Sequence, residues 1–256
     1  MRDTFTEIWQ TARRNKLRTT LTGFAVAWGI FMLIVLLGAG NGLINANLKQ
    51  SNRFLSSSMV VFGGWTSKPY QGLKEGRDIR LHESDMEITA KEFKKNVDEV
   101  GAQYNTSAVI SLGQQYISTS ISGVYPNHIN IDKVEMLHGR FINEIDVKES
   151  RKVLVMSNKQ AKELKCGIGD FVNVGNFAFK VVGIYKEQEN GRANVFSSYS
   201  AIKRIYGANT DDAGRIEFTF HGLPTEEANE AFEKDYRHRL NAVHQAHPED
   251  EDAVWL

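Results

Sequence analysis

The chain has 256 residues, of which 41% are hydrophobic, and its 31 basic and 31 acidic side chains leave no net charge. A neutral chain lacks the basic surface with which nucleic-acid-binding proteins contact phosphates, so we expect no nucleic-acid partner. The single cysteine, Cys166, excludes an intramolecular disulfide. These features leave a protein that is held together by a hydrophobic core and that has one long apolar segment near its N-terminus.

Residues 1–18 predict a short amphipathic helix on the cytoplasmic surface of a membrane. Its apolar residues are mostly three or four positions apart, namely Phe5, Ile8, Trp9, Ala12 and Leu17. Trp9 would lie at the level of the lipid headgroups, and Arg13 and Arg14 would lie near anionic lipid. The alternative is a frayed, solvated tail.

Residues 19–45 predict a transmembrane helix. The 22 residues from Thr19 to Gly40 contain neither a charge nor a proline, and at about 1.5 Å per residue they cover roughly the 30 Å of a bilayer's hydrocarbon layer. Five basic residues, Arg18 among them, and two acidic ones precede this segment, which favours a cytoplasmic N-terminus. Gly23 and Gly29 would allow a second helix to approach closely. A cleavable signal peptide and a buried core helix are the alternatives, although the apolar part of a signal peptide is usually shorter.

Residues 46–256 predict an α+β domain beyond the membrane. Residues 45–57 are expected to continue the helix or to form a connector. Alternating or clustered β-branched and aromatic residues predict strands, at 58–62, 104–124, 153–156, 171–174, 177–182 and 216–220. Helices are expected after a capping box at Ser84–Glu87, after Ser157, and from Pro224 to about Val243. The pair Gly175-Asn176 predicts a two-residue hairpin.

A search for catalytic motifs finds none of the common ones. The sequence has no G-x-x-x-x-G-K-[ST] phosphate loop, no H-E-x-x-H and no G-x-S-x-G. His244 and His247 are three positions apart but are expected to be solvated, as is the acidic run Glu249–Asp252. We therefore predict no catalytic residue, bound cofactor or metal in this chain.

Two blocks of sequence resemble ABC transporter permeases of the MacB/FtsX type. The first is Lys16–Thr22, which runs into the apolar segment. The second is an ordered set that resembles the middle of the family's extracytoplasmic domain: Gly123-Val124-Tyr125-Pro126, Gly139-Arg140-Phe141, Asp146, Val153-Leu154-Val155, Ala161, Leu164, Gly167, Gly169 and Val181-Val182-Gly183-Ile184. The family's usual D-P-I-G turn is replaced by Cys166–Asp170.

The resemblance implies the N-terminal portion of a permease subunit in the bacterial inner membrane. Such permeases act as homo- or heterodimers with an ATPase that binds ATP and Mg²⁺, and ATP hydrolysis there drives a conformational change in the periplasmic domain for export or efflux. A periplasmic adaptor and an outer-membrane channel are further partners of the family. Its periplasmic domain has a porter-like part built from both ends of the segment and an inserted part, which would span about 108–185 here.

Family permeases continue into three further transmembrane helices that this sequence does not contain, so the chain is expected to be a fragment. The alternative function is a single-pass anchored periplasmic interaction or regulatory module, with FtsX-like control of cell-wall hydrolases and no transport. An anchored periplasmic enzyme would need a cluster of reactive groups, and the sequence suggests none.

Overall fold

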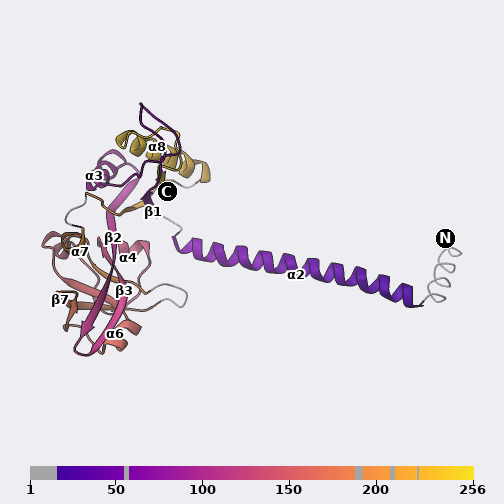
Figure 1. Ribbon diagram of the computed structural model, residues 1–256, viewed down its shortest axis with the longest axis horizontal. Helices are drawn as coiled ribbons and strands as arrows, with labels where there is room; N and C mark the ends of the chain where they lie inside the picture. Colours follow the sequence, from indigo (N-terminus) through magenta and orange to yellow (C-terminus); the bar gives the residue numbers. More distant parts are fainter. Residues whose placement is uncertain (1–15, 55–57, 188–192, 208–210, 224) are drawn as a thin grey trace. The chain divides into compact units, whose positions relative to one another are not determined.

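The computed structural model describes residues 16–54, 58–187, 193–207, 211–223 and 225–256, with backbone alone for 41–54 and 226 (Figure 1). The chain divides into two compact units, residues 1–53 and 54–256. Trp9, Arg13, Arg14 and most of the predicted surface helix 1–18 lie outside the described residues.

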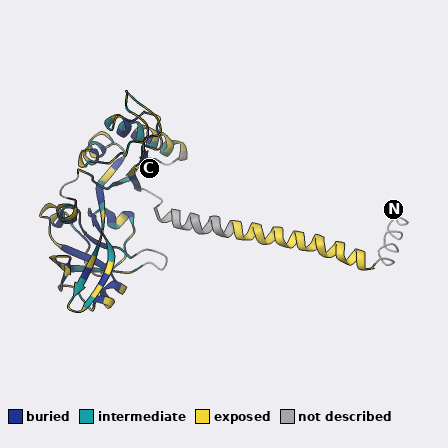
Figure 2. Cartoon of the chain, viewed as in Figure 1, coloured by how far each residue is buried: buried dark blue, intermediate teal, exposed yellow. Residues whose placement is uncertain are grey.

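The first unit contains one long helix, α2 (Lys16–Phe54), as the absence of charges and prolines predicts. Within its stretch Lys16–Gly40 an 18-residue window has a mean hydropathy of 2.3, and the stretch is long and apolar enough to cross a membrane. Every residue of that stretch is exposed (Figure 2). The polar segment that follows remains helical as far as Phe54, which confirms the predicted continuation over those residues.

The second unit is a mixed sheet with helices packed against it, which confirms the predicted α+β class. The strand order is β10-β1-β9-β2-β3-β8-β5-β7-β4, and β6 pairs with β2 and β7. The strands are β1 (Ser58–Gly63), β2 (Val97–Leu112), β3 (Gln115–Val124), β4 (Met136–Gly139), β5 (Val153–Ser157), β6 (Phe171–Val174), β7 (Phe177–Tyr185), β8 (Val195–Ser198), β9 (Arg215–Phe220) and β10 (Val254–Trp255). The helices are α3 (Glu83–Glu92), α4 (His128–Ile131), α5 (Glu144–Lys148), α6 (Asn158–Leu164), α7 (Tyr199–Tyr206) and α8 (Glu226–Val243).

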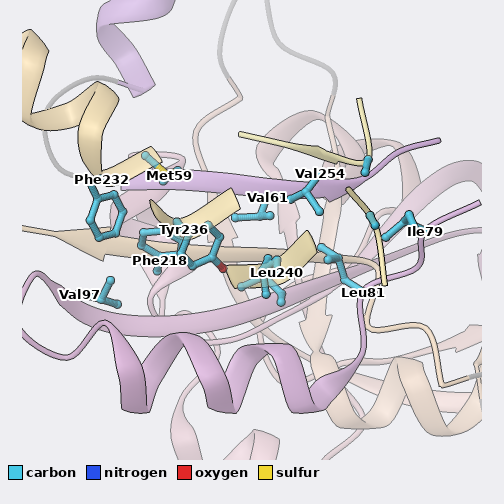
Figure 3. Packing of buried hydrophobic residues seen from close by; sticks show 13 residues of the cluster. Met59, Val61, Ile79, Leu81, Val97, Phe218, Phe232, Tyr236, Leu240 and Val254 are labelled. Atoms are coloured by element: carbon cyan, nitrogen blue, oxygen red, sulfur yellow. The ribbon is translucent and has the colours of Figure 1, made fainter. Parts of the chain in front are cut away.

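One hydrophobic cluster, the terminal core, joins residues from both ends of this unit. Strand β1 lies between β9 and β10, with Val61 opposite Ile216 and Phe62 opposite Trp255. Helix α8 packs its buried face against these strands (Figure 3). The members are Met59, Val61, Ile79, Leu81, Val97, Ile216, Phe218, Phe232, Tyr236, Leu240, Ala246, Ala253 and Val254.

A second cluster, the inner core, is built from the middle of the chain. It contains Ile110, Ile117, Ile121, Leu154, Met156, Ala161, Leu164, Val172, Val174, Phe179, Val181, Val195 and Ile202. Strand β5 is buried on both faces, because Leu154 and Met156 enter this core while Val153 and Val155 enter a third, smaller cluster on the other side. This confirms the prediction of a central strand at 153–156.

The predicted inserted part, 108–185, stays a prediction. Strand β2 runs without a break through position 108. Beyond position 185, β8 and α7 contribute Val195 and Ile202 to the inner core.

Two helix starts differ from the prediction. Helix α3 begins at Glu83, because the carboxylate of Asp85 accepts a hydrogen bond of 2.8 Å from the backbone N–H of His82 and so takes the role predicted for Glu87. Along this helix Thr89 is buried and Ala90 is exposed. Helix α8 begins after Thr225, whose hydroxyl accepts a bond from the N–H of Ala228.

Strand β2 also differs, since it begins at Val97 rather than Tyr104, with an irregular register between Val97 and Val100. Helix α8 buries Phe232, Tyr236 and Leu240, whereas Ala231 is exposed.

Candidate functional site

The apolar helix α2 holds three of the residues that the sequence singles out, Arg18, Gly23 and Gly29. A side chain added at either glycine would meet nothing within 4 Å, so the backbone surface there is open to another helix. The two glycines are six positions apart and are rotated by roughly 120° about the helix axis. They therefore cannot line one contact face, and their role in helix packing stays a prediction.

The sides of α2 differ in residue size. Thr19, Gly23 and Ala27 follow one another at intervals of four, which places small residues on one side. The rings of Phe24, Trp28 and Phe31 lie on another side, with centroids 5.9 and 5.7 Å apart. The helix thus has one side that allows close approach and one that presents aromatic area.

In the second unit, a fully buried histidine lies where α4 meets β9. His128 Nδ1 is 2.8 Å from a carboxylate oxygen of Glu217, and Nε2 is 3.0 Å from a carboxylate oxygen of Asp132. His128 and Glu217 are both 0% exposed. The two ring nitrogens point to different carboxylates, so the three side chains cannot converge on one metal ion.

These carboxylates control the charge of the ring. Burial by itself lowers the pKa of His128, but hydrogen bonds and charge from Asp132 and Glu217 outweigh burial and raise it to about 9. The pKa of Asp132 is raised by burial and lowered more strongly by His128 and the charge of Arg215. The cluster therefore holds an imidazolium at neutral pH.

A second polar cluster ties α3 to the end of α8. The carboxylate of Asp85, 0% exposed, lies 2.8 Å from Nε2 of His244, and the His244 ring stacks on that of His82 at 5.4 Å. Tyr236 and Thr89 share a hydrogen bond of 2.7 Å beside it. The expectation that His244 is solvated is therefore wrong, because α8 brings it against a carboxylate 159 positions earlier in the chain.

A third buried carboxylate, Asp250, corrects the prediction of a solvated acidic turn. Asp250 is 0% exposed and accepts bonds from the backbone N–H and hydroxyl of Ser67, both at 2.8 Å, and from the N–H of Lys68 at 3.0 Å. Burial raises its pKa, but these bonds lower it further than burial raises it. Asn241 donates to the carbonyl of Asp250 and so helps to fix the turn.

The residues that carry the family resemblance have structural roles. Gly139 has φ 75°, and a Cβ there would collide with the carbonyl oxygen of Val182, while one at Gly183 would collide with that of Arg140. Arg140 binds the buried carboxylate of Asp146 through both terminal nitrogens, at 2.5 and 3.1 Å. These positions hold β4 and α5 against β7.

The remaining side chains that could bind a metal or react lie in separate contacts. Among them, no three His, Cys, Asp or Glu side chains could hold a metal ion together. Cys166 is half-buried, and burial followed by the charge of Asp170 raises the pKa of its thiol, which disfavours the reactive thiolate. His244 contacts Asp85, whereas Nδ1 of His247 accepts from the N–H of Glu249, so these two histidines serve separate contacts.

Sequence reasoning missed the buried groups His128, Asp85 and Asp250. Each is a polar residue whose burial depends on at least one partner far away in the chain, namely Glu217 for His128, His244 for Asp85 and Ser67 for Asp250. Glu217 did have a local signal, because it lies between two core residues of an alternating strand and hence faces the opposite side of the sheet. That pattern could not show that α4 covers this side.

The family model for the MacB-like periplasmic core domain matches residues 19–235. The macrolide export ATP-binding/permease protein MacB of Aggregatibacter actinomycetemcomitans is 23% identical over 198 residues, which cover 73% of this chain and 30% of that protein. MacB of Campylobacter jejuni is 27% identical over 180 residues, 68% of this chain and 27% of that protein. The chain thus spans about a third of the length of such relatives.

Two solved structures share the fold. The periplasmic region of MacB from Actinobacillus actinomycetemcomitans aligns with a TM-score of 0.64 at 17% identity, covering 80% of this chain and 89% of that one. The extracellular domain of the noncanonic ABC-type transporter YknZ from Gram-positive bacteria aligns with a TM-score of 0.61 at 17% identity, covering 77% and 97%. Because the family model covers most of the sequence, from the apolar helix into α8, this chain belongs to the MacB-like periplasmic core domain family.

Proposed function

We propose that this chain is the N-terminal portion of a permease subunit in a MacB-like ABC transporter. In this role it couples ATP hydrolysis by a partner to a conformational change in its periplasmic domain for export or efflux. The family match carries the proposal, because it begins at Thr19 and so includes the apolar helix and the α+β unit in one continuous stretch.

The chain would be anchored in the bacterial inner membrane by α2. The basic residues before the apolar stretch support a cytoplasmic N-terminus. The second unit would then be periplasmic, as the likeness to the periplasmic region of MacB supports.

Strand β1 is the element that would receive a movement of the membrane helix. Only residues 55–57 separate α2 from β1 in the sequence, so a displacement of the helix acts on β1 through a short length of chain. Strand β1 pairs with β9 on one side and β10 on the other, and it buries Met59 and Val61 in the terminal core. A pull on β1 would therefore act on the whole terminal core.

The partners would be an ABC ATPase, which holds ATP and Mg²⁺, and a second permease subunit, identical or homologous. The name of the relatives, ATP-binding/permease protein, supports the ATPase as a partner. A periplasmic adaptor, an outer-membrane channel and membrane lipid complete the proposed set. No catalytic step is proposed for this chain itself.

The test is the response of the domain to the nucleotide state. The permease would be purified from its membrane with the ATPase bound, and amide exchange of residues 58–63 would be compared without nucleotide and after trapping with ATP and vanadate. We expect the exchange of β1 to change on trapping. A chain that purifies without any ATPase, and whose coding sequence stops at Leu256 rather than continuing into apolar segments of about 20 residues, would instead support the anchored interaction module.

A further inference from the structure

The seam between α4 and β9 contains a charge that the fold has enclosed completely. Helix α4 has only four residues, too few to be stable by itself. Its Ile129 packs against the third cluster, while its His128 faces Glu217 of β9. The two neighbours of Glu217, Ile216 and Phe218, lie in the terminal core on the other face of the sheet. This short helix therefore links the middle of the chain to the strand that supports β1.

We propose that the His128 cation is an electrostatic latch that fastens helix α4 to strand β9, and that loss of its proton opens the latch. A buried carboxylate and a buried imidazolium each depend on the other, because either one left without its partner would remain charged in a medium of low polarity. With the proton present, Glu217 has a cation at 2.8 Å. Without it, the nearest described cation is Arg215, with Nη2 3.9 Å from the carboxylate.

The other groups around the ring support this assignment. Asp132, 29% exposed, faces Nε2 from the end of α4. The uncharged rings of Phe141 and Phe196 lie beside the imidazole, with centroids 6.4 and 5.1 Å from it. Tyr185 of β7 stands near Asp132, and its pKa is raised, chiefly by burial, so it is neutral in this range. The ring is thus held between two carboxylates, with Arg215 balancing Glu217.

The side chain of Asn127, the N-cap residue of α4, fits closely against the sheet. The side-chain amide of Asn127 donates to the carbonyls of Glu99 and Glu217, both at 3.4 Å. A Cβ at Gly101 would collide with the Asn127 side chain. A neutral ring keeps one N–H for the two carboxylates, so loss of the proton removes the positive charge and one of the two contacts. The two long hydrogen bonds of Asn127 and packing contacts would then support α4, which makes opening of this helix the expected local event.

Amide exchange of the whole chain tests the latch. The reporters are the N–H groups of Ile131 and Asp132, which donate to the carbonyls of Asn127 and His128 inside α4. Exchange would be measured at pH 7 and pH 10 and corrected for the intrinsic effect of pH, with amides of the β2–β3 hairpin as the internal reference. We expect α4 to open at least about tenfold more often at pH 10, because the pKa of His128 is about 9. Equal opening at the two pH values would overturn the proposal.

Variants separate the latch from general destabilisation. His128→Gln should open α4 at pH 7 and abolish the difference between pH 7 and pH 10. The matched control is His221→Gln, which removes an exposed histidine 2.9 Å from a carboxylate oxygen of Asp98. This variant should change neither the opening of α4 at pH 7 nor the difference in opening between pH 7 and pH 10. An equal effect of both variants on α4 would contradict the latch.

Asp132→Asn keeps the proposal testable even if His128→Gln does not fold. Asp132 lies at the surface end of the cluster, so its replacement should leave the fold intact while removing one of the two charges that favour the imidazolium. We expect the pH at which α4 opens to fall by about one unit. An unchanged opening pH in Asp132→Asn would count against the assignment.

Discussion

The terminal core and the inner core are stabilised by contacts of different range. In the terminal core, Asp250 binds Ser67 across 183 positions, and His244 binds Asp85 across 159. In the inner core, Ser157 caps α6 through Gln160, three positions away, and β6 and β7 are joined by a two-residue turn. Long loops must close before the first kind of contact can form, whereas the second kind forms locally. The terminal core therefore depends on contacts between more distant parts of the chain, and it contains β1, the strand that follows the apolar helix α2 in the sequence.

The largest effects should come from truncating a leucine in each core. Leu240→Ala in α8 and Leu164→Ala in α6 each remove a fully buried side chain and should lower the free energy of unfolding by about 3 kcal/mol. Trp65 and Trp255 lie in or beside the terminal part, and residues 66–254 contain no tryptophan. Urea unfolding followed by fluorescence, in a background where Trp9 and Trp28 are phenylalanine, should be shifted more by Leu240→Ala. Equal shifts from the two variants would mean that the two cores unfold as one.

The contact between His128 of α4 and Glu217 of β9 should make the stability of the protein depend on pH. The pKa of His128 is about 9 in the folded chain against 6.5 for a free histidine, so the folded state binds the proton more tightly. The resulting stabilisation is complete below pH 6.5 and is lost as the pH rises through 9. It should amount to something on the order of 3 kcal/mol. Chemical denaturation between pH 6 and pH 10 measures it, and His128→Gln should show a smaller slope over that range.

Removal of the Asp250 carboxylate should weaken the terminal core selectively. Asp250→Ala removes the carboxylate that accepts the part-buried hydrogen bonds from the N–H groups of Ser67 and Lys68. Because hydrogen bonds to a charged group are among the stronger ones, this change should lower the stability by about 2 kcal/mol. Asp250→Asn keeps one acceptor oxygen and should lose less. Exchange of the amides at 67 and 68 should rise in both variants while that of α6 stays the same. An equal rise in amide exchange across the whole second unit would show that the effect of Asp250 is not confined to its surroundings.

The smallest effect should come from the local cap of the inner core. Ser157→Ala removes the hydroxyl that accepts from the N–H of Gln160 at 3.2 Å and should lower the stability by about 1 kcal/mol. Ser157→Asn, which can cap in the same way, is the control and should be nearly neutral. Thermal unfolding of the three proteins makes the comparison. If Ser157→Ala lowered the free energy of unfolding as much as Asp250→Ala, the local cap and the long-range hydrogen bonds would contribute equally. The expected difference between the inner core and the terminal core would then be wrong.

The sequence predicts well where the signal is local. The run from Thr19 to Gly40, which has no charge, is enough to predict a long apolar helix, because this prediction does not depend on what packs against the helix. The turn at Gly175, with φ 57°, and the cap at Ser157 were likewise predictable, since each depends on residues within a few positions. The helix start at Ser84 was wrong for a related reason, because Asp85 offered a competing cap that a pattern search for Glu at the third position passes over.

The sequence by itself thus determined the membrane-type helix, the α+β class, the short inner elements and, through its ordered motifs, the family. Only the tertiary structure decided that Asp85, His128 and Asp250 are buried and paired. A carboxylate or an imidazole is polar in any local pattern, and its free energy depends on the charge that the fold brings beside it. Those partners come from segments up to 183 positions away. The long-range hydrogen bonds beside the terminal core and the contact between α4 and β9 therefore form only when the chain has closed its long loops.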